Sequence, residues 1–224
     1  MYARTGVWAL PAYGILLGLS TVTHQPSVDD FDAYARYVTT DQFLVSHLAA
    51  SVFGAALAII GAGAVTALLV RGRAAGIAVV GLTLTTVANV FMAAAFGGAA
   101  FVQPGLGRAH LAGVEGMPAL NADTAYGPAR FATALAATAL LIVSAVVLGV
   151  AIARTSRRLR WYGVAYAALI SLFALSGFVL PPVQAFTGFA FAAATAALAV
   201  HLPRTVIHPT AASGATPSAT TVTA

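Results

Sequence analysis

The segment from Ala74 to Val102 constrains this chain most, because it is long, apolar and free of charged side chains. Folded as an α-helix, it spans about 43 Å at about 1.5 Å per residue. The hydrocarbon core of a bilayer is about 30 Å thick, so such a helix crosses it with tilt or with its ends in the interface. This segment therefore predicts a chain that folds in a membrane.

Five further segments have the same apolar character, and the composition agrees with them. Only 8% of the 224 residues are charged, whereas soluble domains carry roughly 25%. We predict an all-α, polytopic integral membrane protein, with a six-transmembrane-helix bundle over residues 1–202 and a disordered cytoplasmic tail over residues 203–224. The predicted spans are residues 7–23, 43–70, 74–102, 131–153, 161–180 and 183–202.

The charges between these spans predict the orientation of the bundle. All six acids lie in two long polar segments, residues 24–42 and 103–130. Cytoplasmic segments retain basic residues, so we expect both termini to be cytoplasmic and the acidic segments to lie outside a plasma (inner) membrane. The absence of Lys and the excess of Ala and Arg are typical of a GC-rich bacterial composition. Eight of the eleven basic residues lie in the other polar segments: Arg4, Arg71, Arg73, Arg154, Arg157, Arg158, Arg160 and Arg204.

Residues 7–23 are interpreted as a retained first helix. The rival interpretation is a cleaved signal peptide, because Arg4 precedes an apolar run of suitable length. The sequence after this run, from Ser20 to Ser27, has no small-x-small cleavage pattern, which favours the retained helix.

The two acidic segments are expected to differ in structure. In the first, apolar residues recur at helical spacing after a capping pair formed by Ser27 and Asp30. The second, residues 103–130, contains several Gly and Pro residues and is predicted to be a long loop. We expect the first segment to form a short helix on the membrane surface, through the apolar residues Val28, Phe31, Ala35 and Val38.

Small residues at helical spacing predict close contacts between helices. Gly14 and Gly18 form a GxxxG pattern in the first span. Gly188, Ala192 and Ala196 form a similar stripe in the last span. Such patterns allow helix backbones to approach each other in lipid. We favour packing within the bundle over a dimer face formed with a second copy.

Asn89 is the most polar side chain of the segment 74–102, with Thr85 and Thr86 near the same helical face. A buried amide in hydrocarbon needs a partner or a wet cavity. One hypothesis is a polar spot that lines a pocket for a small ligand or water, as a passive permease would need. The alternative, favoured because polar residues commonly fix packing, is an interhelical hydrogen bond.

Histidines and carboxylates are predicted to gather on the outer face. His24 ends the first span and His47 begins the second, while His110, Glu115 and Asp123 belong to the second acidic segment. Imidazole and carboxylate ligands suit a divalent metal, and two imidazoles can ligate haem. Their spacing matches no metal motif, so ordinary interfacial histidines that bond to loop carboxylates are the simpler alternative.

Catalytic signatures are absent from the sequence. It has no Cys, no Gly-x-Ser-x-Gly, no phosphate-binding glycine loop and no His-Glu-x-x-His. No Asp, Glu, Lys or Arg lies within the six predicted spans, which disfavours an ion-coupled pump. The leading hypothesis is a non-enzymatic accessory or scaffold subunit, or a binder of small apolar molecules.

The alternative from another class is a redox protein with His-ligated haem or metal on the outer face. The predicted partners are the lipid bilayer and either another membrane protein or a second copy of the chain. The net charge of +5 does not indicate nucleic acid, because the arginines flank apolar spans.

Overall fold

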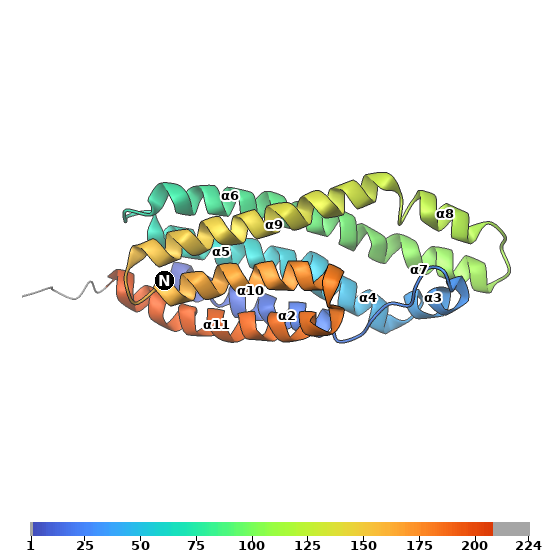
Figure 1. Ribbon diagram of the computed structural model, residues 1–224, viewed down its shortest axis with the longest axis horizontal. Helices are drawn as coiled ribbons and strands as arrows, with labels where there is room; N and C mark the ends of the chain where they lie inside the picture. Colours follow the sequence, from blue (N-terminus) through green and yellow to red (C-terminus); the bar gives the residue numbers. More distant parts are fainter. Residues whose placement is uncertain (1, 208–224) are drawn as a thin grey trace, which may run out of the picture.

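The computed structural model describes residues 2–207, which form an elongated bundle of helices (Figure 1). No strand occurs in this part of the chain. The π-helical segments η1 and η2 lie inside longer helices. In chain order the helices are α1 (Tyr2–Gly6), α2 (Ala9–Ser20), α3 (Phe31–Val38), α4 (Asp41–His47), η1 (Leu48–Gly54), α5 (Ala55–Leu69), α6 (Ala75–Met92), η2 (Ala93–Gly97), α7 (Gly98–Leu111), α8 (Met117–Asp123), α9 (Pro128–Thr155), α10 (Arg160–Val179) and α11 (Pro181–Ile207).

Five continuous helices in the described part of the chain are long and apolar enough to cross a membrane. The first combines α4, η1 and α5, and the second combines α6, η2 and α7. The all-helical architecture and the multi-pass membrane character predicted from the sequence are thereby confirmed. The five helices are Asp41–Leu69, Ala75–Leu111, Pro128–Thr155, Arg160–Val179 and Pro181–Val206.

The predicted first span, residues 7–23, is longer than the helix that forms there, because α2 covers only the 12 residues from Ala9 to Ser20. A turn separates α2 from the short helix α1. Pro11 accounts for the break, because it has no N–H to donate to the Val7 carbonyl and its ring crowds that carbonyl. The backbone nitrogen of Leu10 donates to Val7 instead, at 3.1 Å.

α2 nevertheless belongs to the bundle, because it packs along α11 and against α5. Glycines allow the close approach to α11. A Cβ atom added to Gly14 would lie 2.6 Å from the backbone nitrogen of Ala192, and one added to Gly188 would lie 2.6 Å from that of Gly18. The prediction that these small residues pack within the bundle is confirmed.

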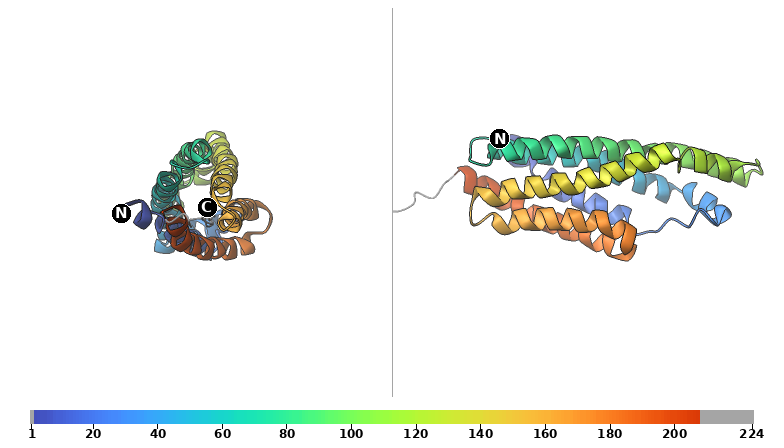
Figure 2. Two further views of the ribbon diagram at one scale, coloured as in Figure 1. Left: turned by 90° about the vertical axis from the view of Figure 1, so that its left-hand side faces the viewer. Right: turned by 45° about the horizontal axis from the view of Figure 1, so that its top comes forward.

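The remaining long helices pack side by side around the same apolar core. α6 packs against α9, α9 against α10, and α10 against α11. The end-on view in Figure 2 shows these helices arranged around the long axis of the bundle. Fully buried side chains from several of them meet in this core, among them Leu10, Val65, Leu148, Phe191 and Leu202.

Residues 103–130, predicted to be a long loop, are mostly helical. α7 continues to Leu111 and α8 follows it. Gly113 and Gly116 turn the chain between these helices with positive φ angles of 85° and 80°, a conformation that costs glycine little. The prediction of a loop is wrong because α7 packs against α3, and this tertiary contact overrides the local Gly and Pro signals.

α3 was predicted correctly as a short helix, but its apolar face packs against other helices of the protein, α7 above all. Asp30 alone caps it, with Oδ1 accepting from the backbone nitrogen of Ala33 at 3.0 Å. A Cβ added to Gly107 of α7 would lie 2.8 Å from the Val38 side chain, which shows how closely the two helices approach. The face of α3 is therefore covered by protein, and the residues buried with it are Phe31, Tyr34, Ala35, Val38 and Phe43.

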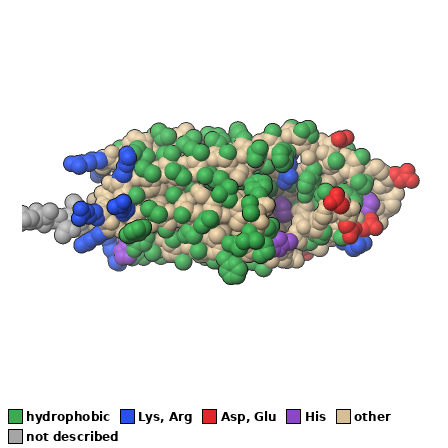
Figure 3. All heavy atoms as spheres, in the orientation of Figure 1, with side chains coloured by type: hydrophobic (Ala, Val, Ile, Leu, Met, Phe, Trp, Pro, Cys, Tyr) green, Lys and Arg blue, Asp and Glu red, His purple; other side chains and the backbone are tan. Residues whose placement is uncertain are grey.

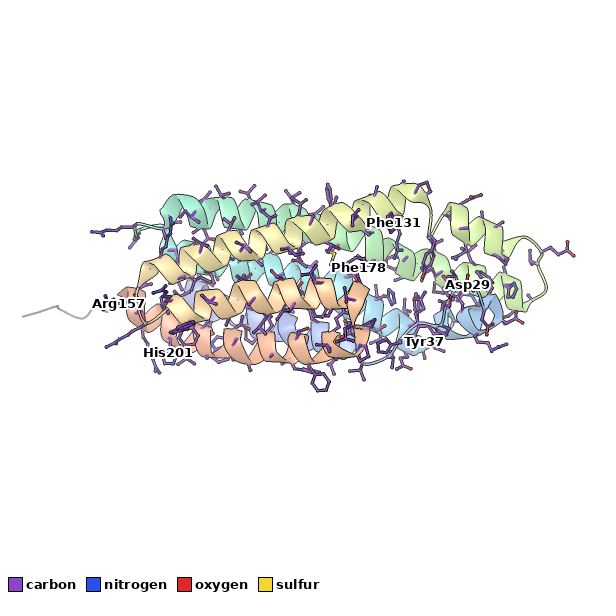
Figure 4. All side chains as sticks on the ribbon, in the orientation of Figure 1. Asp29, Tyr37, Phe131, Arg157, Phe178 and His201 are labelled. Carbon is purple, nitrogen blue, oxygen red and sulfur yellow. The ribbon has the colours of Figure 1, made fainter. Side chains whose placement is uncertain are left out.

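Charged side chains gather at the two ends of the bundle (Figure 3). Acids lie at the end formed by α3, α7 and α8, which we call the acidic head. Most arginines lie at the opposite end, near the α5–α6 and α9–α10 turns, whereas Arg36 of α3 and Arg108 of α7 belong to the acidic head. Figure 4 shows Arg157 and His201 at the arginine end and Asp29 at the acidic head.

α11 is longer than the predicted last span. It continues to Ile207, so residues 203–207, which were assigned to the disordered tail, are helical. The rest of the predicted tail, residues 208–224, lies outside the described residues.

Candidate ligand cavity

A cavity of about 220 Å³ lies among α2, α4, η1, α6, η2, α10 and α11. It is near the turn that joins α10 to α11, on the side of the bundle closer to the acidic head (Figure 1). Its apolar lining includes several aromatic rings and is formed by Tyr13, Leu17, Ala50, Met92, Phe96 and Phe173. Its polar lining is formed by Ser20, Thr21, Ser46, His47, Ser51, Asn89 and Gln184.

Both π-helical segments form walls of this cavity. Ser51 belongs to η1 and Phe96 belongs to η2. A π-helical turn is rare, and such turns occur frequently at functional sites. The two segments contact each other, and a Cβ added to Gly97 would lie 2.9 Å from the side chain of Val52. Two wide turns therefore meet beside the cavity.

His47 is partly buried and is oriented by its own helix. Its Nδ1 lies 3.0 Å from the carbonyl oxygen of Phe43, and the two rings are in contact, tilted by 37° with 4.0 Å between their centroids. A carbonyl oxygen only accepts hydrogen bonds, so Nδ1 carries the proton in this contact. In the neutral imidazole, Nε2 is then the acceptor. His47 thus presents a defined tautomer to the cavity.

Asn89 is 1% exposed and is the most deeply buried amide of the cavity wall. Its Nδ2 donates to the carbonyl of Thr85 at 2.8 Å. Oδ1 has no hydrogen-bond partner among the described residues. The observed bond lies within α6, so the interhelical hydrogen bond favoured from the sequence is not formed. Thr85 is buried beside Asn89, and Thr86 donates to its own helix at Leu82, but neither lines the cavity.

Three hydroxyl groups of the cavity wall donate to their own helices. Ser20 Oγ donates to the Leu17 carbonyl at 2.9 Å, and Thr21 Oγ1 donates to the same carbonyl at 3.1 Å. Ser46 Oγ donates to the Phe43 carbonyl at 2.9 Å. Hydroxyl groups bonded in this way keep oxygen lone pairs that can accept a further hydrogen bond.

Arg130 holds the outer side of η2. Its Nε donates to the carbonyl of Ala95 at 3.2 Å. Its guanidinium lies 5.1 Å from the ring centroids of both Phe96 and Tyr126, within the range of cation–π attraction. Because Phe96 also lines the cavity, Arg130 supports the cavity wall from behind.

The structure separates the predicted metal or haem ligands, which are His24, His47, His110, Glu115 and Asp123. In residues 2–207, no group of three or more His, Cys, Asp or Glu side chains is arranged to hold a metal ion. His110 instead pairs with Asp32, where Nε2 donates to Oδ1 at 2.6 Å and joins α7 to α3. The exposed His24 lies in the connection after α2.

Two further hydrogen bonds hold the acidic head and the segments that lead into it. Tyr34 of α3 donates to Asn121 Oδ1 of α8 at 3.1 Å. Gln25 donates to the hydroxyl of Tyr126 at 2.6 Å. Burial raises the pKa of the Tyr34 hydroxyl above its usual value of 10.0, so it stays neutral and donates at physiological pH. These hydrogen bonds have a structural role, because they connect segments that are far apart in the sequence.

Sequence reasoning gave Asn89 a pocket role only as the less favoured hypothesis, considered His47 as a metal ligand or an ordinary interfacial histidine, and missed the rest of the wall. A signal was present, because Ser20 ends the first span while Ser46 and Gln184 begin the second and the last. If the distance of each polar residue from the outer end of its span had been compared, Ser20, Ser46 and Gln184 would have been placed at a similar depth.

No known protein family, curated protein or solved structure matches this chain. Its function is therefore inferred from the cavity and the architecture around it.

Proposed function

We propose that this chain is a non-enzymatic integral membrane protein that binds one small, largely apolar molecule in the cavity beside His47 and Asn89. The observation that carries the proposal is a space of about 220 Å³ that aromatic rings and the buried amide of Asn89 line together. Ligand pockets are mostly apolar, with a few placed polar groups that fix orientation, and this lining has that composition.

The volume supports a ligand of modest size. A cavity of about 150 Å³ holds a benzene ring, and pockets for drug-sized ligands begin at about 300 Å³. Tyr13, Phe96 and Phe173 supply aromatic surface against which a ring can pack. A molecule with one ring or two fused rings fits these limits.

The proposal includes the orientation in a bacterial plasma (inner) membrane, with both termini cytoplasmic. α1 and α2 together cover residues 2–20, about 28 Å of chain at about 1.5 Å per residue, which supports a sixth, broken crossing beside α11. The helix Ala75–Leu111 is about 55 Å long, about 25 Å more than the hydrocarbon core. Its excess length and the arginines at the opposite end support an acidic head outside the membrane.

The proposal is tested by filling the cavity with a larger side chain and measuring ligand binding. In lipid nanodiscs, equilibrium dialysis should show saturable binding of 2-naphthol above the partitioning measured with empty nanodiscs. Ala50→Phe places a ring in the cavity, because Ala50 lines it, and we expect this variant to lose the saturable binding. The matched control is Ala56→Phe, since Ala56 is exposed on the next helical segment and leaves the cavity open.

Equal binding by Ala50→Phe and Ala56→Phe, with both proteins folded by circular dichroism, would rule out the cavity as the site. Absence of saturable binding by the wild-type protein would count against the function itself.

A further inference from the structure

We propose that the cavity selects neutral molecules that donate a hydrogen bond, such as phenols and aromatic alcohols, over molecules that only accept one. This inference rests on the proposed function and names the ligand class of the same cavity. It follows from an inventory of the protons on the cavity wall, since each polar group there has a defined set of donors and acceptors.

The hydroxyl protons of Ser20, Thr21 and Ser46 are already used. Each of these groups donates to a carbonyl of its own helix at 2.9–3.1 Å. A ligand that meets them therefore finds oxygen lone pairs. The cavity wall gains acceptors in this way without carrying a negative charge.

The two strongest acceptors are Asn89 Oδ1 and His47 Nε2. Asn89 cannot exchange its nitrogen and oxygen positions, because this would place two acceptor oxygens about 2.8 Å apart at Thr85. His47 is fixed by the carbonyl of Phe43, which requires the proton on Nδ1. A ligand that donates a hydrogen bond to either atom supplies a partner that no described group of the protein supplies.

The cavity wall also carries hydrogen-bond donors. A ligand hydroxyl, which both donates and accepts, can therefore form more hydrogen bonds than a ligand group that only donates. Tyr13 and Ser51 line the cavity with hydroxyls that make no hydrogen bond within residues 2–207. Gln184 uses one amide proton on the Phe173 carbonyl at 3.2 Å and keeps the other. A phenolic hydroxyl can donate to Asn89 or His47 and accept from one of these groups.

The ligand is expected to be neutral. No Asp or Glu lines the cavity to compensate an ammonium group, and an unpaired buried charge is costly. The guanidinium of Arg130 lies over the Phe96 ring, which places a positive charge behind that wall. A cation is therefore disfavoured, and a neutral ring with one hydroxyl satisfies both the polar and the apolar lining.

The experiment compares three probes of similar shape: 2-naphthol, which donates, 2-acetylnaphthalene, which only accepts, and naphthalene, which does neither. Binding to the full-length protein in nanodiscs is measured by equilibrium dialysis against empty nanodiscs. One hydrogen bond is worth about 0.5–1.5 kcal/mol. We therefore expect 2-naphthol to bind about threefold to tenfold more tightly than 2-acetylnaphthalene, which leaves the acceptors unpaired, and naphthalene to bind most weakly because it pairs with no wall group. Equal affinity for 2-naphthol and 2-acetylnaphthalene would overturn the inference.

Variants then locate the acceptors. Asn89→Leu and His47→Phe keep the approximate shape of each side chain and remove its acceptor, so the preference for 2-naphthol should fall toward one while naphthalene binding is retained. Gln103→Leu is the matched control, because Gln103 is 1% exposed and does not line the cavity. It should keep the wild-type preference. If neither cavity variant lowers the preference, the acceptor assignment is wrong.

The outcomes separate this inference from the proposed function. Saturable binding of all three probes with equal affinity, blocked by Ala50→Phe, would leave the cavity as a binding site and remove the donor selectivity. No saturable binding of any probe would remove both.

Discussion

Asp32 shows how a single charged residue ties the acidic head together. Its Oδ1 accepts from His110 Nε2 at 2.6 Å, which joins α3 to α7. The hydrogen bond from His110 holds the pKa of Asp32 below its usual value of 3.8, and the nearby Arg36 acts in the same direction. The carboxylate therefore stays charged in the folded protein at a pH where the unfolded chain would be protonated.

This lowered pKa predicts a pH dependence of stability. The contribution of Asp32 is fully present above its unfolded pKa of about 4 and is lost as the pH falls through the lower, folded pKa. We expect the melting temperature to fall on acidification below about pH 4, and Asp32→Asn to show a smaller fall. Thermal unfolding followed by circular dichroism between about pH 6 and about pH 2 measures it.

Asp29→Asn is the control for this prediction, because Asp29 bonds to Ser27 and does not join α3 to α7. It should keep the wild-type profile. A profile for Asp32→Asn that overlays the wild type would show that the contact with His110 does not contribute.

At the scale of helices, the contact between α2 and α11 depends on glycine. A Cβ atom at Gly14 would lie 2.6 Å from the backbone of Ala192, which cannot move aside as a flexible side chain would. Gly14→Ala should therefore push the two helices apart and lower the free energy of unfolding by about 1–3 kcal/mol. Unfolding of the purified protein in mixed detergent micelles measures the change.

Gly63→Ala is the matched control, because a Cβ at Gly63 meets nothing within 4 Å. It should be neutral or should stabilise the helix by up to about 1 kcal/mol, since Ala has the higher helix propensity. Similar destabilisation by both variants would point to a general effect of losing a glycine and would contradict the contact argument.

The sequence predicted helices better than it predicted their interruptions and ends. Every long apolar run became a helix, because in lipid the backbone must satisfy its own hydrogen bonds. The break before α2 had a local cause in Pro11, a residue that is visible in the sequence. The extension of α7 had a tertiary cause, the packing of Gly107 against Val38, which no local pattern reveals.

For the whole molecule, the proposed orientation predicts which positions a reagent can reach from outside the cell. The chain has no natural cysteine, so one introduced cysteine reports one place. We expect Glu115→Cys, in the acidic head, to react with a membrane-impermeant maleimide on intact cells. Gly72→Cys, in the α5–α6 turn, should react only after the cells are opened.

Both positions are exposed in the folded protein, so a difference between them reports the membrane barrier rather than burial. Gly72→Cys also leaves Arg71 and Arg73 in place, which preserves the charges that set the orientation. Labelling of Gly72→Cys on intact cells would contradict the proposed orientation and would place the α5–α6 turn outside the cell.

The cavity could be predicted only in part, and the reason lies in the way it is assembled. Asn89 could be singled out because an amide in the middle of an apolar span needs a partner or water, although a packing bond was the favoured hypothesis. His47 was predicted to be an outer-face histidine, with a metal site as the less simple alternative. The wide turns η1 and η2 could not be foreseen, because they form where two helices meet and leave no simple residue pattern.

The helix that carries Asn89 also reaches the acidic head, because Ala75–Leu111 is continuous from the α5–α6 turn to the end of α7. A molecule seated beside Asn89 would therefore contact the same helix that supports the acidic head. Between the two places lie η2 and Pro104, where the regular hydrogen-bond ladder of the helix is interrupted, so the two halves of this helix can bend relative to each other.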